Sequence, residues 1–297
     1  MKPKVTIGVC VRNSQQFVRE AISSILDQDF PHELMEAIFV DDGSEDETFS
    51  IINSYVPRMD IKAKVFHHEW KGLGQSRNVV VDNTRGDYVI WVDGDMILPK
   101  DHLTKQVEFM NKNPKVGIAK ARYGMINQES VVAVLENVPF MVYDSKDGSV
   151  DSKLPGTGGS IYRVEAIRQV NGFDSGMRGV GEDQDAAFRI REAGWLLKRS
   201  SAIFYERRVQ TWDGVWRKWF WYGFGDYDPY YKNRGVFSLF RMTPAAGFIN
   251  GFLYIADAYR LIRRRSVLLL PFHFAFEMTA WCIGFINGNM RKGLHTR

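Results

Sequence analysis

The sequence has little cysteine, no obvious leader and no repeats, and each absence narrows the possibilities. Its two cysteines, Cys10 and Cys282, are far apart among 297 residues, which excludes a disulfide framework and any metal site built on paired cysteines. A reducing, cytosolic setting is therefore expected. The apolar run after Lys4 is short and stops at Arg12-Asn13, which argues against a signal peptide.

What is present is typical of a globular protein with an uneven distribution of charge. The chain is 45% hydrophobic and 25% charged, which excludes disordered and collagen-like classes. The net charge of +4 hides a division. Residues 207–297 carry 14 basic and 5 acidic residues, a net of +9, and 21 of the 40 aromatic residues. Residues 1–206 carry 25 basic and 30 acidic residues, a net of −5.

The first two-thirds of the chain alternate between strand and helix patterns, which predicts an α/β fold with a mostly parallel sheet. The expected strands are Val5–Val11, Glu36–Val40, Lys64–His67, Tyr88–Val92 and an extended segment near Val116–Ala121. The expected helices are 15–27, 47–55, 74–83, 101–112 and 183–193. Ser14 is expected to cap the first of them, and Ser44 or Asp46 the second. Ligands of such sheets bind beyond the carboxyl ends of the strands, so the polar residues that follow each strand are the candidates for chemistry.

Asp93-Gly94-Asp95 directly follows the fourth strand and is the first such candidate. Two carboxylates flanking a glycine can face one hard cation, and oxygen ligands suit Mg²⁺ or Mn²⁺. In isolation the same tripeptide is more often a simple turn.

Six segments, in order, resemble the motifs of the family 2 glycosyltransferases, which share the GT-A fold. The resemblance covers about residues 4–200. The matching segments are VTIGVCVRN (5–13), FVDDGSEDET (39–48), GLGQSRNV (72–79), GDYVIWVDGDMILP (86–99), GTGGSIYR (156–163) and GEDQDAAFRIREAGW (181–195).

The resemblance implies a site for a nucleoside diphosphate sugar, with UDP as the expected nucleotide. The implied nucleotide-binding residues are Val11, Arg12, Asn13, Asp41, Asp42, Gly72, Arg77, Asp93 and Gly94. Some have structural alternatives. Asn13 would share the base site or hold its turn, Asp42 would bind the nucleoside or cap a turn, and Arg77 would reach the diphosphate or pair with the Asp93 region.

The implied reaction is inverting glycosyl transfer, in which one base deprotonates the acceptor hydroxyl. By resemblance that base is Asp183, and Glu182 helps to position the acceptor; the alternative is an acidic helix start favoured by the helix dipole. The implied acceptor and sugar contacts are Gly158, Gly159 and Ser160, together with Trp216 and Trp219. An ordinary glycine-rich loop and an aromatic helix packed on the catalytic domain are the competing interpretations.

The metal site departs from the family pattern. Many members have a metal-binding His about twenty residues after the Glu-Asp motif, whereas this sequence has Ile203–Arg208 there, without His. We expect Asp93 and Asp95 to bind Mn²⁺ or Mg²⁺, with Glu206 or water as the further ligand.

The basic, aromatic tail indicates contact with a membrane surface. The segment Ser266–Ile286 is about long enough to span a bilayer, yet it contains Pro271, His273 and Glu277, and a buried Glu is costly in lipid. We therefore expect helices that lie in the membrane plane or re-enter it on the cytosolic face. A true span and a soluble dimerisation helix are the alternatives. No RNA-binding motif accompanies the aromatics, so no nucleic-acid partner is expected.

Together these patterns predict a catalytic GT-A domain over residues 1–206 and a membrane-associating helical region over 207–297. The expected function is transfer of a sugar from a nucleoside diphosphate to a lipid-linked or polysaccharide acceptor. The alternative is a non-catalytic nucleotide-sugar-binding or membrane scaffold protein. A sugar-phosphate nucleotidyltransferase is disfavoured, because CVRNSQQF (10–17) stands where that class has a basic, glycine-rich loop.

Overall fold

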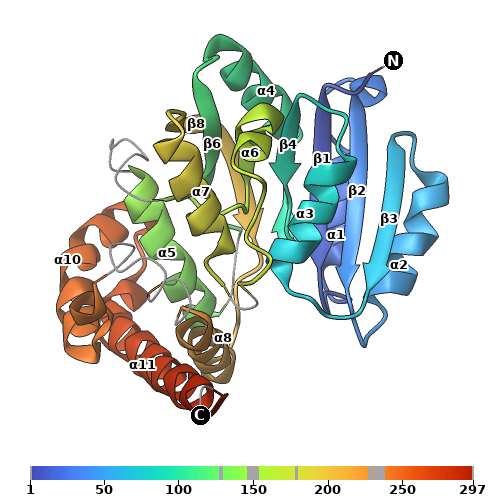
Figure 1. Cartoon of the computed structure of the whole chain (residues 1–297). Helices are drawn as coiled ribbons and strands as arrows, with labels where there is room; N and C mark the ends of the chain where they lie inside the picture. Colours follow the sequence, from blue (N-terminus) through green and yellow to red (C-terminus); the bar gives the residue numbers. More distant parts are fainter. Residues whose placement is uncertain are drawn as a thin grey trace. The chain divides into compact units, whose positions relative to one another are not determined.

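The computed structural model describes residues 2–126, 130–145, 154–177, 180–226, 230 and 238–295, with side chains up to residue 290. The chain forms two units (Figure 1). The first comprises Met1–Gly124, Gly148–Arg178 and Glu182–Arg207, and the second Met125–Asp147, Gly179–Gly181 and Arg208–Arg297. The structural division thus also falls near residue 207, and the second unit takes in a further segment, 125–147.

The first unit is built on one eight-stranded sheet, in the order β3-β2-β1-β4-β7-β6-β8-β5. Strands β1 to β4 pair in parallel, as do β6 and β8, whereas β7 and β5 run antiparallel to their neighbours. The mostly parallel sheet expected from the sequence is therefore confirmed. The strands are β1 (Val5–Val11), β2 (Met35–Asp42), β3 (Lys62–His68), β4 (Tyr88–Trp91), β5 (Met96–Ile97), β6 (Val116–Tyr123), β7 (Ser160–Arg163) and β8 (Leu196–Glu206).

Helices cover both faces of this sheet, and each face has its own apolar core. One core takes side chains from α1, α2 and α4, and the other takes them from α3, α6 and α7, which stand together in front of the sheet in Figure 1. The helices of the first unit are α1 (Val18–Leu26), η1 (His32–Leu34), α2 (Thr48–Tyr55), η2 (Val56–Arg58), α3 (Leu73–Asn83), α4 (His102–Lys112), α6 (Val164–Gln169) and α7 (Glu182–Glu192).

The predicted side-chain caps of the first two helices are wrong. The side chain of Ser14 does not cap α1, which begins at Val18 without a side-chain cap. Instead, the Ser14 backbone carbonyl accepts from the amides of Phe17 and Val18, 3.0 and 2.9 Å away. Helix α2 follows Glu47, also without a side-chain cap, although the Asp46 carboxylate accepts from the Thr48 amide at 3.0 Å.

The second unit is helical. Its apolar core joins Leu135, Val138 and Val142 to Ala258, Leu270 and Phe274. Among the described residues, one helical stretch, Arg265–Met290, is long and apolar enough to cross a membrane, and 56% of its apolar window is buried inside the protein. The elements are α5 (Val131–Ser145), α8 (Trp212–Gly225), η4 (Leu239–Met242), α10 (Pro244–Ile262), η5 (Arg265–Leu269) and α11 (Leu270–His295).

Candidate functional site

The carboxyl ends of β1, β2 and β4 meet at one edge of the sheet, as the strand pattern predicts. Val11 at the end of β1 pairs with Asp41 near the end of β2. The segment after β4 continues the same ladder, since the Val92 amide donates to the Gly8 carbonyl at 3.0 Å. Asp93 follows immediately, so the predicted nucleoside and metal segments are neighbours.

Two carboxylates predicted to bind the nucleoside are buried and already hydrogen-bonded. Asp41 is fully buried and binds the amide and hydroxyl of Ser44, and His67 Nδ1 at 2.7 Å. Asp42 accepts from the amides of Lys71 and Gly72 at 2.8 and 3.0 Å. In this structure both acids shape the loops after β2 and β3, and their contact with a nucleoside stays a prediction.

The turn after β1 is held by its own side chains. Asn13 has a positive φ of 52°, which Asn tolerates better than most residues, and its Oδ1 accepts from the Glu45 amide at 2.9 Å. Arg12 pairs with Glu45 at 3.2 Å and lies over the ring of Trp70, 5.5 Å from its centroid. Trp70 is 42% exposed, so this edge carries an accessible aromatic face beside a cation.

Arg77 on α3 links the predicted nucleotide segment to the predicted catalytic segment. Its buried guanidinium contacts the carboxylate of Glu182 and lies 3.9 Å from that of Asp93. Burial alone would lower the pKa of Arg77, but Glu182, Asp183 and Asp93 together raise it, so Arg77 stays charged. Burial raises the pKa of Glu182 to about 7, although Arg77 opposes this shift. Contact of Arg77 with a diphosphate stays a prediction.

Asp183 begins the outer part of the site and remains accessible. It is half-buried, whereas Glu182 beside it is buried. One Asp183 oxygen accepts from the Thr157 amide at 3.2 Å and the other from the Gln184 amide at 2.8 Å. The side chain is thereby oriented without being enclosed, as a base that must meet a substrate requires.

The glycine-rich segment 156–158 lies against both Asp93 and Asp183. A Cβ on Gly158 would stand 2.9 Å from Asp93 Oδ2, and a Cβ on Gly156 would stand 3.0 Å from Asp183 Oδ2. Gly159 and Ser160 are buried. The Gly159 amide donates to the Trp91 carbonyl at 3.1 Å and the Ser160 hydroxyl to the Gly156 carbonyl at 2.7 Å. Of the three residues of this loop that were predicted to contact the acceptor, Gly158 is half-buried, whereas Gly159 and Ser160 are buried.

Charges from four other segments act on Asp93. Burial raises its pKa, Arg77 and Lys120 oppose the rise, and Glu206 and Asp183 add to it. The pairing of Met96 with Glu206 and the hydrogen bond from the Arg207 amide to the Asp95 carbonyl, 2.9 Å, bring the end of β8 to the Asp93–Asp95 turn.

The three carboxylates predicted to bind the metal have the chemistry of a hard-cation site, but among the described residues their oxygens do not form a group within 4.8 Å of one another, so joint binding of one ion stays a prediction. Asp93, Asp95 and Glu206 are all half-buried carboxylates, and oxygen ligands of this kind are those that Mg²⁺ and Mn²⁺ take.

A different group of side chains gathers more tightly in the second unit. Ligand atoms of Glu136, His273 and Glu277 lie within 4.8 Å of one another. Lys218 Nζ is 2.7 Å from Glu136 Oε2, so an ammonium already supplies positive charge there. These side chains therefore form a buried cluster in which Lys218 balances carboxylate charge, and we do not infer a metal centre there.

The two tryptophans predicted to contact the acceptor lie on α8, inside the second unit. Trp219 donates through Nε1 to Glu136 at 3.3 Å. The ring of Trp216 lies 5.4 Å from that of Phe276 on α11. These contacts are those of a packed helix, and acceptor binding by either residue stays a prediction.

The edge of the sheet thus brings together residues from several of the six sequence motifs. They are Asp93 and Asp95, the buried pair Arg77–Glu182, and the half-buried Asp183. The model of glycosyl transferase family 2 matches residues 6–170, more than half of the chain. The chain belongs to glycosyl transferase family 2.

Curated relatives of this family 2 chain include longer proteins. It is 30% identical over 110 residues to the poly(ribitol-phosphate) beta-N-acetylglucosaminyltransferase TarS of Staphylococcus aureus, covering 37% of this chain and 19% of TarS. It is 35% identical over 109 residues to the putative teichuronic acid biosynthesis glycosyltransferase TuaG of Bacillus subtilis, covering 37% of this chain and 42% of TuaG. The chain thus spans less than half of these two relatives.

Solved structures share the fold at low sequence identity. The mannosyltransferase PcManGT from Pyrobaculum calidifontis, in complex with GDP-Man and Mn²⁺, superposes with a TM-score of 0.70 at 16% identity, covering 98% of this chain and 88% of that one. S. aureus TarS 1–349 in complex with UDP gives a TM-score of 0.56 at 18% identity, covering 98% and 92%. The predicted GT-A fold is confirmed.

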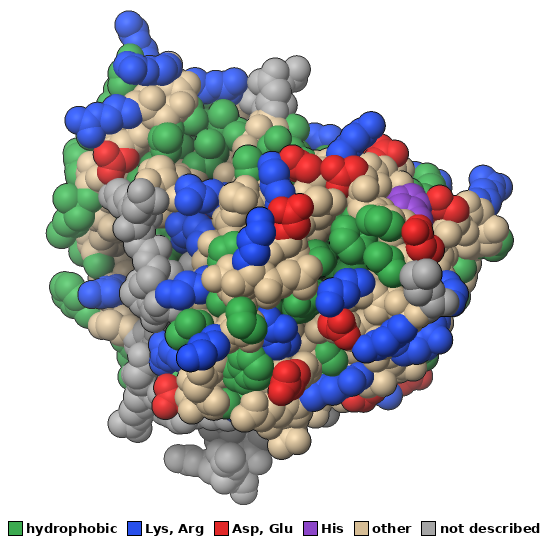
Figure 2. Space-filling view, turned by 90° about the horizontal axis from the view of Figure 1, so that it is seen from above, with side chains coloured by type: hydrophobic (Ala, Val, Ile, Leu, Met, Phe, Trp, Pro, Cys, Tyr) green, Lys and Arg blue, Asp and Glu red, His purple; other side chains and the backbone are tan. Residues whose placement is uncertain are grey.

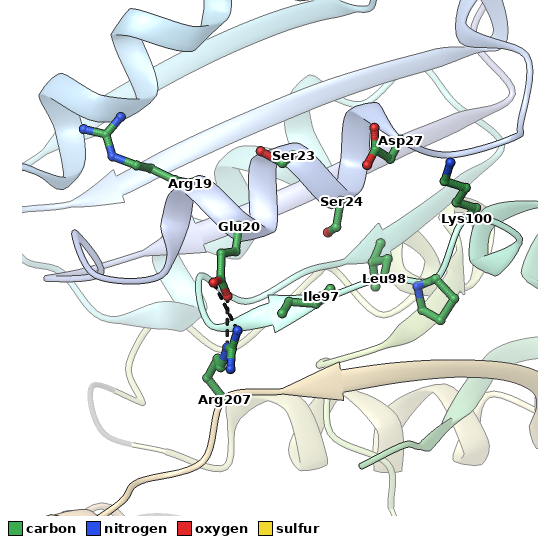
Figure 3. A pocket seen from close by; sticks show the side chains of 10 residues that line it. Arg19, Glu20, Ser23, Ser24, Asp27, Ile97, Leu98, Lys100 and Arg207 are labelled. Carbon is green, nitrogen blue, oxygen red and sulfur yellow. Dashed lines mark hydrogen bonds and ion pairs between the residues drawn. The ribbon is translucent and has the colours of Figure 1, made fainter. Parts of the chain in front are cut away.

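A separate pocket of about 450 Å³ lies between α1 and the segment after β5 in the family 2 chain (Figure 3). The guanidinium of Arg207 points to the carboxylate of Glu20 there, with N–O distances of 2.9 and 3.0 Å. None of the predicted site residues lines it. The pocket is therefore not the predicted nucleotide site. Its lining residue Arg207 is linked to Asp95 through the backbone hydrogen bond described above.

Sequence reasoning missed several residues of the site, and three of them left a signal. His67 and His68 end β3, so the strand-end argument applied to the third strand would have found them. Lys120 interrupts the otherwise apolar start of β6, and its ammonium binds the Gly158 carbonyl. Trp70 left no signal, because its place depends on how distant loops meet.

Proposed function

We propose that this chain is an inverting glycosyltransferase with a UDP-sugar donor and a lipid-linked or saccharide acceptor, acting at the cytoplasmic face of a membrane. The observation that carries the proposal is the contact of segment 156–158 with both Asp93 and Asp183. It brings the predicted diphosphate end and the predicted base to the two sides of one short loop.

The chain's own groups supply the following chemistry. An Asp183 carboxylate oxygen accepts the proton of the acceptor hydroxyl, whose oxygen forms a bond to the anomeric carbon. The bond from that carbon to the diphosphate oxygen breaks on the opposite face and leaves its electron pair on the nucleotide, so the configuration inverts and no covalent intermediate is required. Arg77 orients Glu182 beside the base.

Asp93, Asp95 and Glu206 would hold the divalent cation. Such an ion, when bound, acts as a Lewis acid toward the diphosphate oxygens. The complexes of TarS with UDP and UDP-GlcNAc and of PcManGT with GDP-Man and Mn²⁺ support a nucleotide-sugar donor and a metal. They differ in base and sugar, so the choice of UDP is part of the proposal.

The test is a donor panel with the purified chain and Mn²⁺, in which nucleotide release and thermal stabilisation are measured together. We expect one UDP-sugar both to stabilise the chain and to be turned over, and a chelator to stop the release. Asp95→Ala should require far more Mn²⁺, whereas Asp101→Ala, at the start of α4, should not. Stabilisation without turnover would favour the scaffold alternative, and full activity of Asp95→Ala in chelator would contradict the metal site.

A further inference from the structure

The second unit presents large apolar side chains to its outside. On α10, Ile249, Phe252 and Leu253 are 63%, 55% and 69% exposed, and their spacing puts them on one side of the helix. Leu268 on η5 and Phe272 on α11 are 59% and 65% exposed. We call these five residues the apolar face.

The apolar face is continuous across two helices. The ring of Phe248 on α10 lies 5.2 Å from that of Phe252 and 5.4 Å from that of Phe272 on α11. Exposed apolar groups joined in this way mark interaction sites, whereas isolated ones are ordinary. Hydrophobic side chains also gather at the left of the view in Figure 2, with Lys and Arg side chains beside them.

Inside the unit the helices meet through glycine. A Cβ on Gly247 would stand 2.7 Å from the Phe274 carbonyl oxygen, and one on Gly251 would stand 2.4 Å from Pro271 Cα. Small residues four apart that bring two backbones together are the packing device of helices in lipid, where large apolar side chains face outward. In α10 the glycines face α11 and the large side chains face out.

The interior of the unit holds charged side chains beside its apolar core. Glu136, Lys218, His273 and Glu277 are buried or largely buried and bind one another at 2.7 to 3.5 Å. The unit thus buries a cluster of charged groups while it leaves large apolar side chains exposed, which is unusual for a protein that faces water on all sides.

Arginines at the ends of α10 specify the sign of the partner. Arg241 precedes the helix, and Arg263, Arg264 and Arg265 follow it. Arg241, Arg263 and Arg265 are exposed. Basic side chains beside an apolar surface complement the phosphates of anionic lipids, each contributing on the order of tenfold in affinity near the surface.

We propose that the apolar face is a membrane-docking surface, with α10 in the plane of an anionic leaflet, its large side chains among the acyl chains and the flanking arginines at the phosphates. Basic residues at both ends of α10 suit a helix lying in the interface. The proposal rests on the membrane location proposed above, and its test requires neither donor nor acceptor.

The experiment measures binding of the full chain to vesicles of phosphatidylcholine, with and without phosphatidylglycerol as the anionic lipid. We expect tighter binding to the anionic vesicles. Phe252→Gln with Leu253→Gln should weaken binding to both vesicle types about tenfold or more. Arg263→Gln with Arg264→Gln and Arg265→Gln should weaken binding to anionic vesicles alone, by well over tenfold because three charges are removed, with a flatter salt dependence.

Leu196→Gln is the matched control, since Leu196 is also exposed, at 43%, but lies in the first unit; it should bind as the unchanged chain does. Circular dichroism and thermal unfolding check that each variant folds. Asp183→Asn should bind vesicles normally, so a failed transfer reaction and a failed membrane contact are told apart.

Three outcomes would overturn the proposal. One is unchanged vesicle binding by the Phe252/Leu253 variant. Another is a change from dimer to monomer in that variant without loss of vesicle binding, which would make a second copy of the chain the occupant. The third is retention of the unchanged chain in vesicles after alkaline carbonate extraction, which would make α11 a true span.

Discussion

In the first unit apolar side chains fill the space between sheet and helices, and the charged groups of the site stand at the sheet edge, where Asp93 and Asp183 are half-buried. The second unit has an apolar core as well, but it also buries a cluster of charged groups and exposes many large apolar side chains. Of the twenty exposed large hydrophobic side chains in the described residues, three belong to the first unit and seventeen to the second. One chain thus contains two units whose surfaces suit different surroundings.

The difference shows that burial follows the solvent rather than the residue type. Apolar groups leave water wherever a better environment exists. In the first unit that environment is the core. For the exposed apolar side chains of the second unit, it is the membrane that we propose as the partner. The excess of exposed apolar surface is therefore informative about a partner.

The largest expected effect tests the first unit. Asp183→Asn should lower the transfer rate by about 10²- to 10⁴-fold, because the variant cannot accept the acceptor proton. Donor affinity, measured by calorimetry, should change little. Asp185→Asn is the control, since Asp185 pairs with Arg189 at 2.8 Å on the same helix. Full activity in Asp183→Asn would remove the base assignment.

The next effect tests whether the interior charges of the second unit are sealed from water. Glu136→Ala leaves Lys218 without its carboxylate partner, 2.7 Å away, and should cost about 3–5 kcal/mol in urea unfolding. Asp213→Ala breaks the exposed pair with Arg217 and should cost about 1 kcal/mol or less. If Glu136→Ala and Asp213→Ala lowered the free energy of unfolding equally, the charged groups inside the second unit would be hydrated. The two units would then differ less in how they bury charge.

The pH dependence of stability sharpens the same point. Burial alone would lower the pKa of His273, but Glu136 and Glu277 raise it from 6.5 to about 9, and burial raises the pKa of Glu277 from 4.5 to about 7. Both groups bind protons more tightly when folded, so stability decreases as pH rises. The loss extends from about pH 4.5 to 7 for Glu277 and from about 6.5 to 9 for His273.

Thermal unfolding from pH 5 to 10 measures this loss. His273→Gln should flatten the curve between about pH 7 and 9, because Glu277 and Glu182 complete their loss near pH 7 and the Cys10 and Cys282 thiols, whose pKa values are raised by burial from 9.0, contribute only from about pH 9 upward. A curve that stays equally steep in the variant would assign the titration to other groups.

The smallest effect tests a surface contact of the first unit. Glu20→Ala removes the ion pair between Glu20 and Arg207, whose side chains are 47% and 34% exposed, respectively. The free energy of unfolding should fall by about 0–1 kcal/mol. The backbone bond from Arg207 to Asp95 remains, so the Mn²⁺ requirement should stay close to that of the unchanged chain. A large rise in that requirement would mean that the Arg207 side chain positions the metal loop.

The sequence predicted the elements that have a clear hydrophobic period, and it missed those that depend on distant partners. Strands β1, β2 and β4 were found because buried parallel strands are continuous apolar runs, whereas β3 is a partly exposed strand at the edge of the sheet. Strands β5, β7 and β8 were missed, the first two because two to four residues carry too little pattern. Helix α5 was also missed, because Pro139 lies inside an otherwise apolar stretch.

The linear sequence by itself determined the family, the parallel core, the order of the motifs and the concentration of basic and aromatic residues after residue 206. These features are local, as they depend on the period of apolar residues and on short runs of polar ones. Only the tertiary structure decided that Asp41 and Asp42 face their own loops, that Arg77 pairs with Glu182, and that α10 turns its glycines inward. Each of these depends on which groups from distant segments share a buried space, and a one-dimensional pattern contains no such distances.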